Sequence, residues 1–185
     1  MDANLVERAR GGDERAFEAL TVTWHPRLFR LAHGILRDAE LAEDTVQHAF
    51  LETWRWLPRL EEPARFEGWM TGHLMRACRS LEADQDPVDE GDGLAAAVPL
   101  ATDPLASLID RDQLSRGFRQ LDFDDRAVLV LRYLASMEVE AAGLALSLKA
   151  DAVEARVEVA LQHLGRALDG DAAPAPGLSP QTEGV

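Results

Sequence analysis

One stretch of the chain, residues 81–104, contains seven acidic side chains and no basic one, together with three prolines and two glycines. Such a composition resists packing into a core, because like charges repel one another and both proline and glycine interrupt regular structure. We interpret it as an acidic linker that separates two folded parts, residues 1–80 and residues 105–168. Residues 169–185 have the composition of a disordered tail.

Acidic residues dominate the whole chain, with 33 Asp and Glu against 19 Lys and Arg and a net charge of −14. That sign argues against a protein held on nucleic acid or on an anionic membrane mainly by bulk positive charge. The single cysteine, Cys78, excludes an internal disulfide framework and a cysteine-rich zinc site. The charged N-terminus is unlike a signal peptide, and no apolar run approaches the roughly 18 residues that cross a bilayer. These features predict a cytoplasmic protein that does not engage a membrane.

Apolar residues in the first part recur at spacings of three and four, which predicts helices. Phe17, Leu20 and Trp24 share one helix face, and we expect Pro26 to break that helix and to open the next. The apolar faces of two further helices are Val46, Phe50, Trp54 and Leu57, and Phe66, Trp69, Met70, His73 and Ala77. Trp56 falls off these faces, so both a structural role and a role as a surface anchor stay open for it.

The second part shows the same helical spacing. Helices are predicted over residues 105–121, 128–134, 139–146 and 151–168, the last opened by a capping box of Asp151 and Glu154. The short third helix, the turn and the long last helix have the proportions of a helix-turn-helix, although spacing alone equally allows an ordinary bundle. No segment alternates apolar and polar residues long enough for a strand. The predicted fold class is therefore all-α, with two small helical domains joined by an acidic linker.

Motifs for catalysis are missing from the sequence. His48 and Glu52 stand four residues apart, which we interpret as a surface pair and not as metal ligands. Arg76 and Arg79 flank Cys78 and could lower the pKa of its thiol, but a lone cysteine on an amphipathic helix is more often a small buried residue. The sequence has no glycine-rich phosphate loop and no serine nucleophile motif. It predicts a binding protein, not an enzyme, without a metal or a cofactor.

Several motifs on these predicted helices carry a family resemblance. The motifs of the first part are ERARGGDERAFEAL, HPRLFRLAHGIL, AEDTVQHAFLETW and FEGWM. Those of the second part are QLDFDDRAVLVLRYL and AVEARVEVALQHLGRAL. Together they resemble bacterial RNA polymerase sigma factors of the extracytoplasmic-function (ECF) group. The first set resembles that family's region 2, and the second set resembles its region 4, which contains a helix-turn-helix.

The resemblance implies partners and sites. Core RNA polymerase and promoter DNA are the implied partners, and an anti-sigma factor is a further candidate. The residues that match polymerase-binding positions are Glu43, Asp44, Gln47, Phe50, Leu51 and Trp54, and the third helix should dock on the clamp helices of the largest polymerase subunit. The residues implied to bind DNA are Arg76, Arg79 and Arg156.

The implied DNA-binding surfaces depart from the family pattern. Where the family usually has Gly-Thr-Val-Lys-Ser-Arg at the start of its recognition helix, residues 151–156 are Asp-Ala-Val-Glu-Ala-Arg. Only Arg156 is left of the basic set. The basic run that usually ends the promoter-melting helix is replaced by residues 81–86, Leu-Glu-Ala-Asp-Gln-Asp. Because carboxylates repel phosphate and each lost cation removes a phosphate contact, this pattern predicts weakened DNA contacts.

Three classes of function stay open at this point. One is a divergent sigma factor that binds core polymerase and directs it to promoters. Another is a sigma mimic, an interaction protein that occupies an anti-sigma factor or the polymerase without binding DNA. The third is an unrelated helical enzyme or scaffold. The resemblance favours the first and the charge favours the second, and we take the divergent sigma factor as the prediction.

Overall fold

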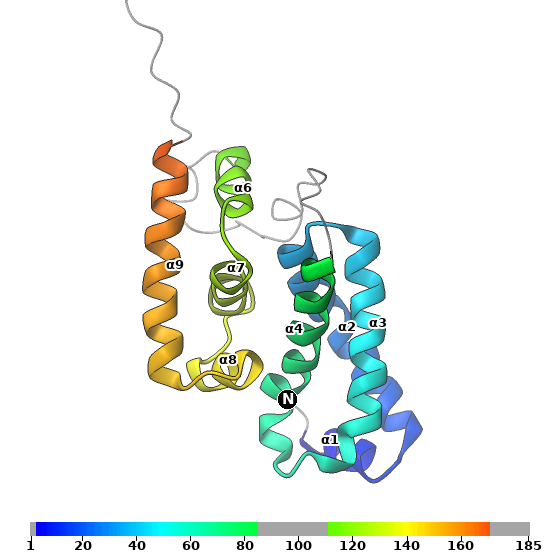
Figure 1. The fold of residues 1–185 in the computed structure, drawn as a ribbon. Coiled ribbons are helices and arrows are strands. Elements are labelled where there is room, and N and C mark those ends of the chain that lie inside the picture. The colour runs from blue at the N-terminus through cyan, green and yellow to red at the C-terminus, as the bar shows by residue number, and fades with distance from the viewer. Residues whose placement is uncertain (1–2, 85–110, 171–185) are drawn as a thin grey trace, which may run out of the picture.

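The computed structural model describes residues 3–84 and 111–170, and the regular elements in these ranges are all helical (Figure 1). This confirms the predicted all-α fold class. The first part contains α1 (Ala3–Arg10), α2 (Glu14–Leu36), α3 (Ala39–Trp56) and α4 (Phe66–Asp84), with the 3₁₀ turns η1 (Leu57–Arg59) and η2 (Pro63–Arg65) before α4. The second part contains α6 (Arg111–Arg119), α7 (Phe123–Leu129), the π-helical turn η4 (Val130–Leu134), α8 (Val139–Leu146) and α9 (Ala150–Gly170).

Helix α2 runs through Pro26 without a break, so the helix boundary predicted there is wrong. A proline inside a helix lacks the backbone N–H and costs about 3 kcal/mol. Pro26 lies on the exposed side of the helix. Buried residues on either side of it, such as Trp24 and Leu28, continue one apolar stripe that packs against α3 and α4. Burial of that stripe outweighs the local cost of the proline.

The capping box predicted for the last helix is also wrong. Helix α9 begins at Ala150, so Asp151 lies inside its first turn and not at the N-cap position. Asp151 Oδ1 accepts a hydrogen bond from the backbone N–H of Ala152, at 3.0 Å, and the described residues show no bond from it to Glu154. An acid in the first turn still suits the helix dipole.

Two helices extend past the predicted domain boundaries. Helix α4 continues to Asp84, beyond the boundary at residue 80, and α9 continues to Gly170. The remaining residues of the predicted linker, 85–104, lie outside the described residues, as do the start of the next predicted helix, 105–110, and the tail from 171.

The helix-turn-helix is present, and a tight turn joins its two helices. Ser147 ends α8 in the left-handed region, at φ 59°. Leu148 N–H then donates back to Gly143 O at 2.8 Å. A Cβ at position 143 would lie only 2.7 Å from Leu148 O, so the close approach of the turn requires glycine there.

The two parts of the molecule share one continuous apolar core. Helix α4 lies between them and packs on one side against α2 and α3 and on the other against α8 (Figure 1). Leu28, Phe66 and Met70 are buried in the first part, and Leu131 and Val153 in the second. The helices α3 and α9 lie on opposite sides of the molecule, so their outer faces point away from each other.

Candidate functional site

The residues predicted to bind polymerase follow one face of α3. Asp38 caps this helix, because its Oδ1 accepts a hydrogen bond from Leu41 N at 2.9 Å. Phe50 is buried, and Asp44, Gln47 and Leu51 are exposed, with Leu51 68% exposed. An exposed leucine beside polar side chains suits a protein-docking face that stays soluble when unoccupied.

Phe17 of α2 packs against the two aromatic side chains of this α3 face. Phe17 meets the ring of Phe50 edge-on, with centroids 6.5 Å apart, and packs against the half-buried Trp54 at 4.7 Å. Glu43 accepts hydrogen bonds from His25 Nε2 at 3.0 Å and from Gln47 Nε2 at 3.3 Å. The bond from His25 lowers the pKa of the Glu43 carboxyl most, and the bond from Gln47 lowers it further. Glu43 is therefore ionised at neutral pH and tied to α2, and is not a free side chain on the outer face.

Three aromatic rings on α2 form a stack that was not predicted from the sequence. Phe29 stacks between His25 and His33, with centroid distances of 6.3 Å and 5.7 Å. His25 also lies nearly parallel to Phe50, at 6.4 Å. The signal available in the sequence was their spacing of four residues, which places all three rings on one helix face. The stack connects α2 to the α3 face.

A groove of about 520 Å³ lies between α3 and α4. The aromatic and basic side chains that line it include Trp56, Trp69, His73, Arg59 and Arg76. Trp56 Nε1–H donates to Glu52 Oε2 at 2.8 Å, and the Arg59 guanidinium lies 4.2 Å from the centre of the Trp56 ring. Both contacts fix the plane of this half-buried ring, which is the tryptophan that falls off the apolar faces in sequence.

His73 holds one of the groove's cations in place. Its Nδ1 lies 2.8 Å from the Arg76 guanidinium, and because arginine only donates, Nδ1 is the acceptor and carries no proton. Burial lowers the pKa of His73 to about 4, and the charge of Arg76 acts in the same direction. Trp69 meets the imidazole edge-on at 4.5 Å. At neutral pH the imidazole is uncharged and Arg76 keeps its full charge at the groove.

The groove has the chemistry of a site for single-stranded nucleic acid. Such sites combine aromatic faces, on which bases stack, with cations that follow the backbone. Within the described ranges, neither Arg59 nor Arg76 forms an ion pair with a carboxylate. His48 and Glu52, interpreted from sequence as a surface pair, both line this groove.

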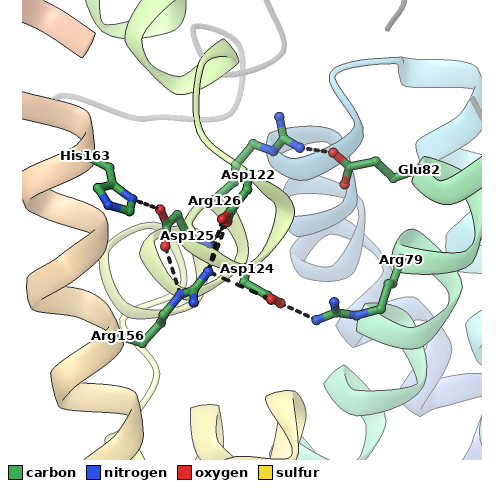
Figure 2. A network of polar contacts seen from close by, with 8 residues as sticks. All are labelled: Arg79, Glu82, Asp122, Asp124, Asp125, Arg126, Arg156 and His163. Carbon is green, nitrogen blue, oxygen red and sulfur yellow. Dashed lines mark hydrogen bonds and ion pairs between the residues drawn. The ribbon is translucent and has the colours of Figure 1, made fainter. Parts of the chain in front are cut away.

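Arg79, the second residue predicted to bind DNA, points toward the other part of the molecule (Figure 2). It forms an ion pair with Asp124 on α7, and its guanidinium lies 4.4 Å from the centre of the Phe123 ring. One face of α4 therefore presents Arg76 to the groove, while a neighbouring face presents Arg79 to the second part.

Arg156, the third predicted DNA-binding residue, is enclosed by carboxylates from the start of α7 (Figure 2). Its Nε lies 2.8 Å from Asp125 Oδ1, and its Nη2 lies 3.1 Å from Asp122 Oδ1 and 3.9 Å from Asp124 Oδ2. Asp125 is 1% exposed and also pairs with His163. No local pattern in the sequence indicates this enclosure, because residues 122–125 are 31 or more positions away from Arg156 in the chain.

The outer face of α9 carries the acidic side chains noted in sequence. Asp151, Glu154 and Glu158 are all exposed, as are Val159 and Leu161. Among residues 150–157 Arg156 is the only basic one. The face that a helix-turn-helix would present to a major groove therefore carries net negative charge.

The lone cysteine is not activated by its surroundings. Cys78 is buried, and burial raises the pKa of its thiol to about 12, so the thiol stays protonated in spite of the neighbouring arginines. Among the described residues, no group of three metal-binding side chains could hold an ion. No helix in the described ranges is both long enough and apolar enough to span a bilayer.

Comparisons with known proteins place the chain among sigma factors. The family profile described as Sigma-70 region 2 matches residues 20–86. The RNA polymerase sigma factor CarQ of Myxococcus xanthus is 31% identical over 143 residues, which are 75% of this chain and 80% of CarQ. The ECF RNA polymerase sigma factor SigM of Mycobacterium tuberculosis is 27% identical over 169 residues, which are 90% of this chain and 84% of SigM.

Two solved structures share the fold. CnrH, an RNA polymerase sigma factor of Cupriavidus metallidurans, was solved with the cytosolic domain of CnrY. It matches with a TM-score of 0.70 at 24% identity, over 92% of this chain and 99% of CnrH. The sigma factor RpoE, solved with the anti-sigma factor NepR from Bartonella quintana, matches with a TM-score of 0.62 at 20% identity, over 84% and 98% of the two chains.

Proposed function

This chain belongs to the ECF group of RNA polymerase sigma factors, and on that premise we propose that it joins core polymerase through α3 and contacts promoter DNA mainly through its first part. The role is transcription initiation, by binding and without a catalytic step of its own. This proposed role implies a location in the cytoplasm, where bacterial RNA polymerase acts. An anti-sigma factor, as NepR is for RpoE, is a further proposed partner.

The polymerase contact is proposed for the exposed part of the α3 face. Asp44, Gln47 and Leu51 are accessible, and Phe50 and Trp54 support them. Leu51 is the most exposed apolar side chain among the described residues of this face. Placing a carboxylate at such an apolar contact leaves an unpaired charge in the interface, which costs binding energy.

One contrast supports the DNA part of the proposal. Arg59 and Arg76 line an aromatic groove without carboxylate partners among the described residues, whereas Arg156 lies among three carboxylates. Melted promoter strands expose bases that can stack on Trp56 or Trp69. The acidic start of α9 offers duplex DNA little attraction. Promoter selection would accordingly depend more on the melted strand than on the duplex that the helix-turn-helix meets.

The decisive experiment is transcription in vitro with core RNA polymerase on fragmented genomic DNA. The wild-type chain should produce discrete transcripts. The L51D variant should lose polymerase binding at least twentyfold, while L161D, which charges an exposed leucine on α9, should bind as the wild type does. Discrete transcripts from L51D would contradict the assigned α3 contact.

The sigma mimic is the alternative, favoured by the acidic face of α9. It predicts that the wild type binds polymerase or an anti-sigma factor, yet yields no transcripts while an authentic sigma factor is active in parallel. In that case the function of the chain would be competition for a partner that it shares with authentic sigma factors, and not promoter recognition.

A further inference from the structure

The groove between α3 and α4 contains a buried hydrogen-bond donor that has no partner. Because Nδ1 of His73 accepts from Arg76, the single proton of the neutral imidazole is on Nε2. Nε2 is buried, and within the described ranges it has no hydrogen-bond partner. Buried polar groups are nearly always hydrogen-bonded, since an unpaired donor has lost its bond to water. The free chain therefore keeps this N–H group at a cost in stability.

Neighbours on α4 fix the direction of this donor. His73 follows Trp69 by four residues and precedes Arg76 by three, so the three side chains lie on one face of the helix. A flip of the imidazole would break the 2.8 Å bond from Arg76 to Nδ1. The Nε2–H group is thus held in one orientation, unlike the ammonium or guanidinium at the end of a long side chain.

The surroundings of His73 indicate which ligand can satisfy this donor. The indole rings of Trp56 and Trp69 line the groove, and flat rings stack on such surfaces. Arg59 and Arg76 supply charge for a phosphate backbone. A free anion would meet the cations but leave the indole rings uncovered. An unstacked nucleobase in a single strand contacts the indole rings, the cations and the N–H group together.

An N–H donor needs an acceptor, and the four bases differ in what they offer. Thymine, cytosine and guanine each carry a carbonyl oxygen, which has two lone pairs and accepts from a broad range of directions. Adenine carries no carbonyl oxygen, and each of its ring nitrogens has one lone pair in a single direction. A carbonyl oxygen therefore suits a donor whose own orientation is fixed.

We propose that His73 is a specificity-determining residue of the groove, whose Nε2–H donates to the carbonyl oxygen of one unstacked thymine, cytosine or guanine. This inference rests on the single-stranded DNA contact proposed above for the groove. Trp69 is half-buried and meets the imidazole at 4.5 Å, and its side chain rotates to uncover Nε2 as the base enters. A base without an acceptor leaves the donor unpaired, so the cost carried by the free chain becomes discrimination between bases.

Two single strands of about ten nucleotides test the donor with the full wild-type chain. One is oligo(dT), and the other carries at every position difluorotoluene, an apolar ring with the shape of thymine but without its strong acceptors. The two strands have the same charge, so both should show the same salt slope. Oligo(dT) should bind about fivefold more tightly. In nitrogen-15 spectra of the histidine side chains, the Nε2–H proton should move downfield with oligo(dT) only.

The matched variants H73N and H73Q separate this donor from the bond to Arg76. The amide of asparagine takes the place of Nδ1 and can still accept from Arg76, whereas the longer glutamine places its amide N–H near the position of Nε2. H73N should bind the two strands equally and keep the salt slope of the wild type. H73Q should keep most of the preference for oligo(dT). A residue that only positions Arg76 would give the reverse, with H73N resembling the wild type and H73Q altered.

Oligo(dA) provides the comparison among natural bases. Its affinity should be the same in H73N as in the wild type, because adenine offers no carbonyl oxygen to the donor. The comparison is made between variants on one strand, so the self-stacking of oligo(dA) cancels. An equal loss on oligo(dA) and oligo(dT) in H73N would contradict a contact to a carbonyl oxygen.

The results distinguish a failure of this inference from a failure of the proposed function. Equal binding of oligo(dT) and its apolar analogue by the wild type, or a preference that persists in H73N, would overturn the role of His73. The groove would then still bind single strands through Arg59 and Arg76. Binding of neither strand by the wild type would overturn both the role of His73 and the DNA contact of the groove, and would leave the α3 contact in place.

Discussion

The groove between α3 and α4 and the start of α9 each contain an arginine that the family resemblance predicts to bind DNA, Arg76 and Arg156, yet the surroundings of the two differ. In the groove, Arg76 contacts a neutral imidazole and Arg59 lies over an indole ring. At the start of α9, Arg156 contacts the carboxylates of Asp122, Asp124 and Asp125. The neighbours of an arginine therefore decide whether its charge is free for another partner, and the number of basic residues in a segment is a poor guide to that.

The difference has a structural origin in α7. Asp122 caps this helix by accepting a hydrogen bond from Asp125 N at 2.8 Å, and two more acids follow in its first turn. These acids suit the helix dipole. The same turn faces α9, so acids that stabilise α7 also pair with Arg156.

The largest expected effect concerns the groove. The double variant R59Q/R76Q should bind single-stranded DNA about thirtyfold more weakly, and its salt slope should fall by about 1.4, because two phosphate contacts are lost. Fluorescence titration at several salt concentrations measures both. The control R65Q/R166Q makes the same charge change on exposed arginines that do not line the groove, and should stay within twofold of the wild type.

The groove should also be the acid-sensitive part of the molecule. The folded pKa of His73, about 4, lies below its ordinary value of 6.5, so the unfolded chain binds a proton first as the pH falls. The contribution of His73 is complete above pH 6.5 and is lost between 6.5 and 4. It amounts to about 2 kcal/mol by pH 5. Denaturant unfolding at pH 7 and pH 5 measures it.

The matched control for this pH effect is H48Q, which removes an exposed histidine at the same groove. H48Q should retain the full pH dependence, whereas H73Q should have a flatter profile even though it is less stable at pH 7. Equal slopes in H73Q and the wild type would assign the acid sensitivity to other groups.

A smaller effect is expected when the charge of α9 is reversed. E154K with E158R replaces two exposed carboxylates by cations on the outer face of the helix. The wild type should bind duplex DNA barely at physiological salt, and the variant should gain about tenfold with a clear salt dependence. Sequence-selective duplex binding by the wild type would show that α9 recognises DNA in spite of its charge, and would remove the contrast with the groove.

The smallest effect is expected at Arg156 itself. R156Q should change duplex affinity less than twofold, because the guanidinium already interacts with the acids of α7. R156Q should instead lower the free energy of unfolding, since Asp125 is buried and would lose Arg156 and keep only His163 as an ion-pair partner. Thermal unfolding and DNA titration on the same samples separate the two effects, and a fivefold loss of affinity would mean that Arg156 is free to reach phosphate.

Much of the fold could be predicted because helices follow local periodicity. The stripe through Val46 and Phe50 predicted α3, and the short apolar run from Val139 to Leu146 predicted α8. The errors arose where a local signal was outweighed. Pro26 is a strong local breaker, but the apolar stripe of α2 is buried on both sides of it. Asp151 resembled a cap, but the helix begins one residue earlier.

By itself the sequence determined the helical class, the acidic character of α9 and the family to which the chain belongs. Composition, the spacing of apolar residues and sequence motifs all depend on residues that are close together in the chain. Tertiary structure decided which arginines are available. Arg156 meets residues more than thirty positions away, and Arg79 meets Asp124 from the other part of the chain. The close crossing of Gly68 and Ala141, which brings the two parts together, likewise depends on backbone positions that no local pattern encodes. Charge acts through space, so only the folded chain fixes its partners.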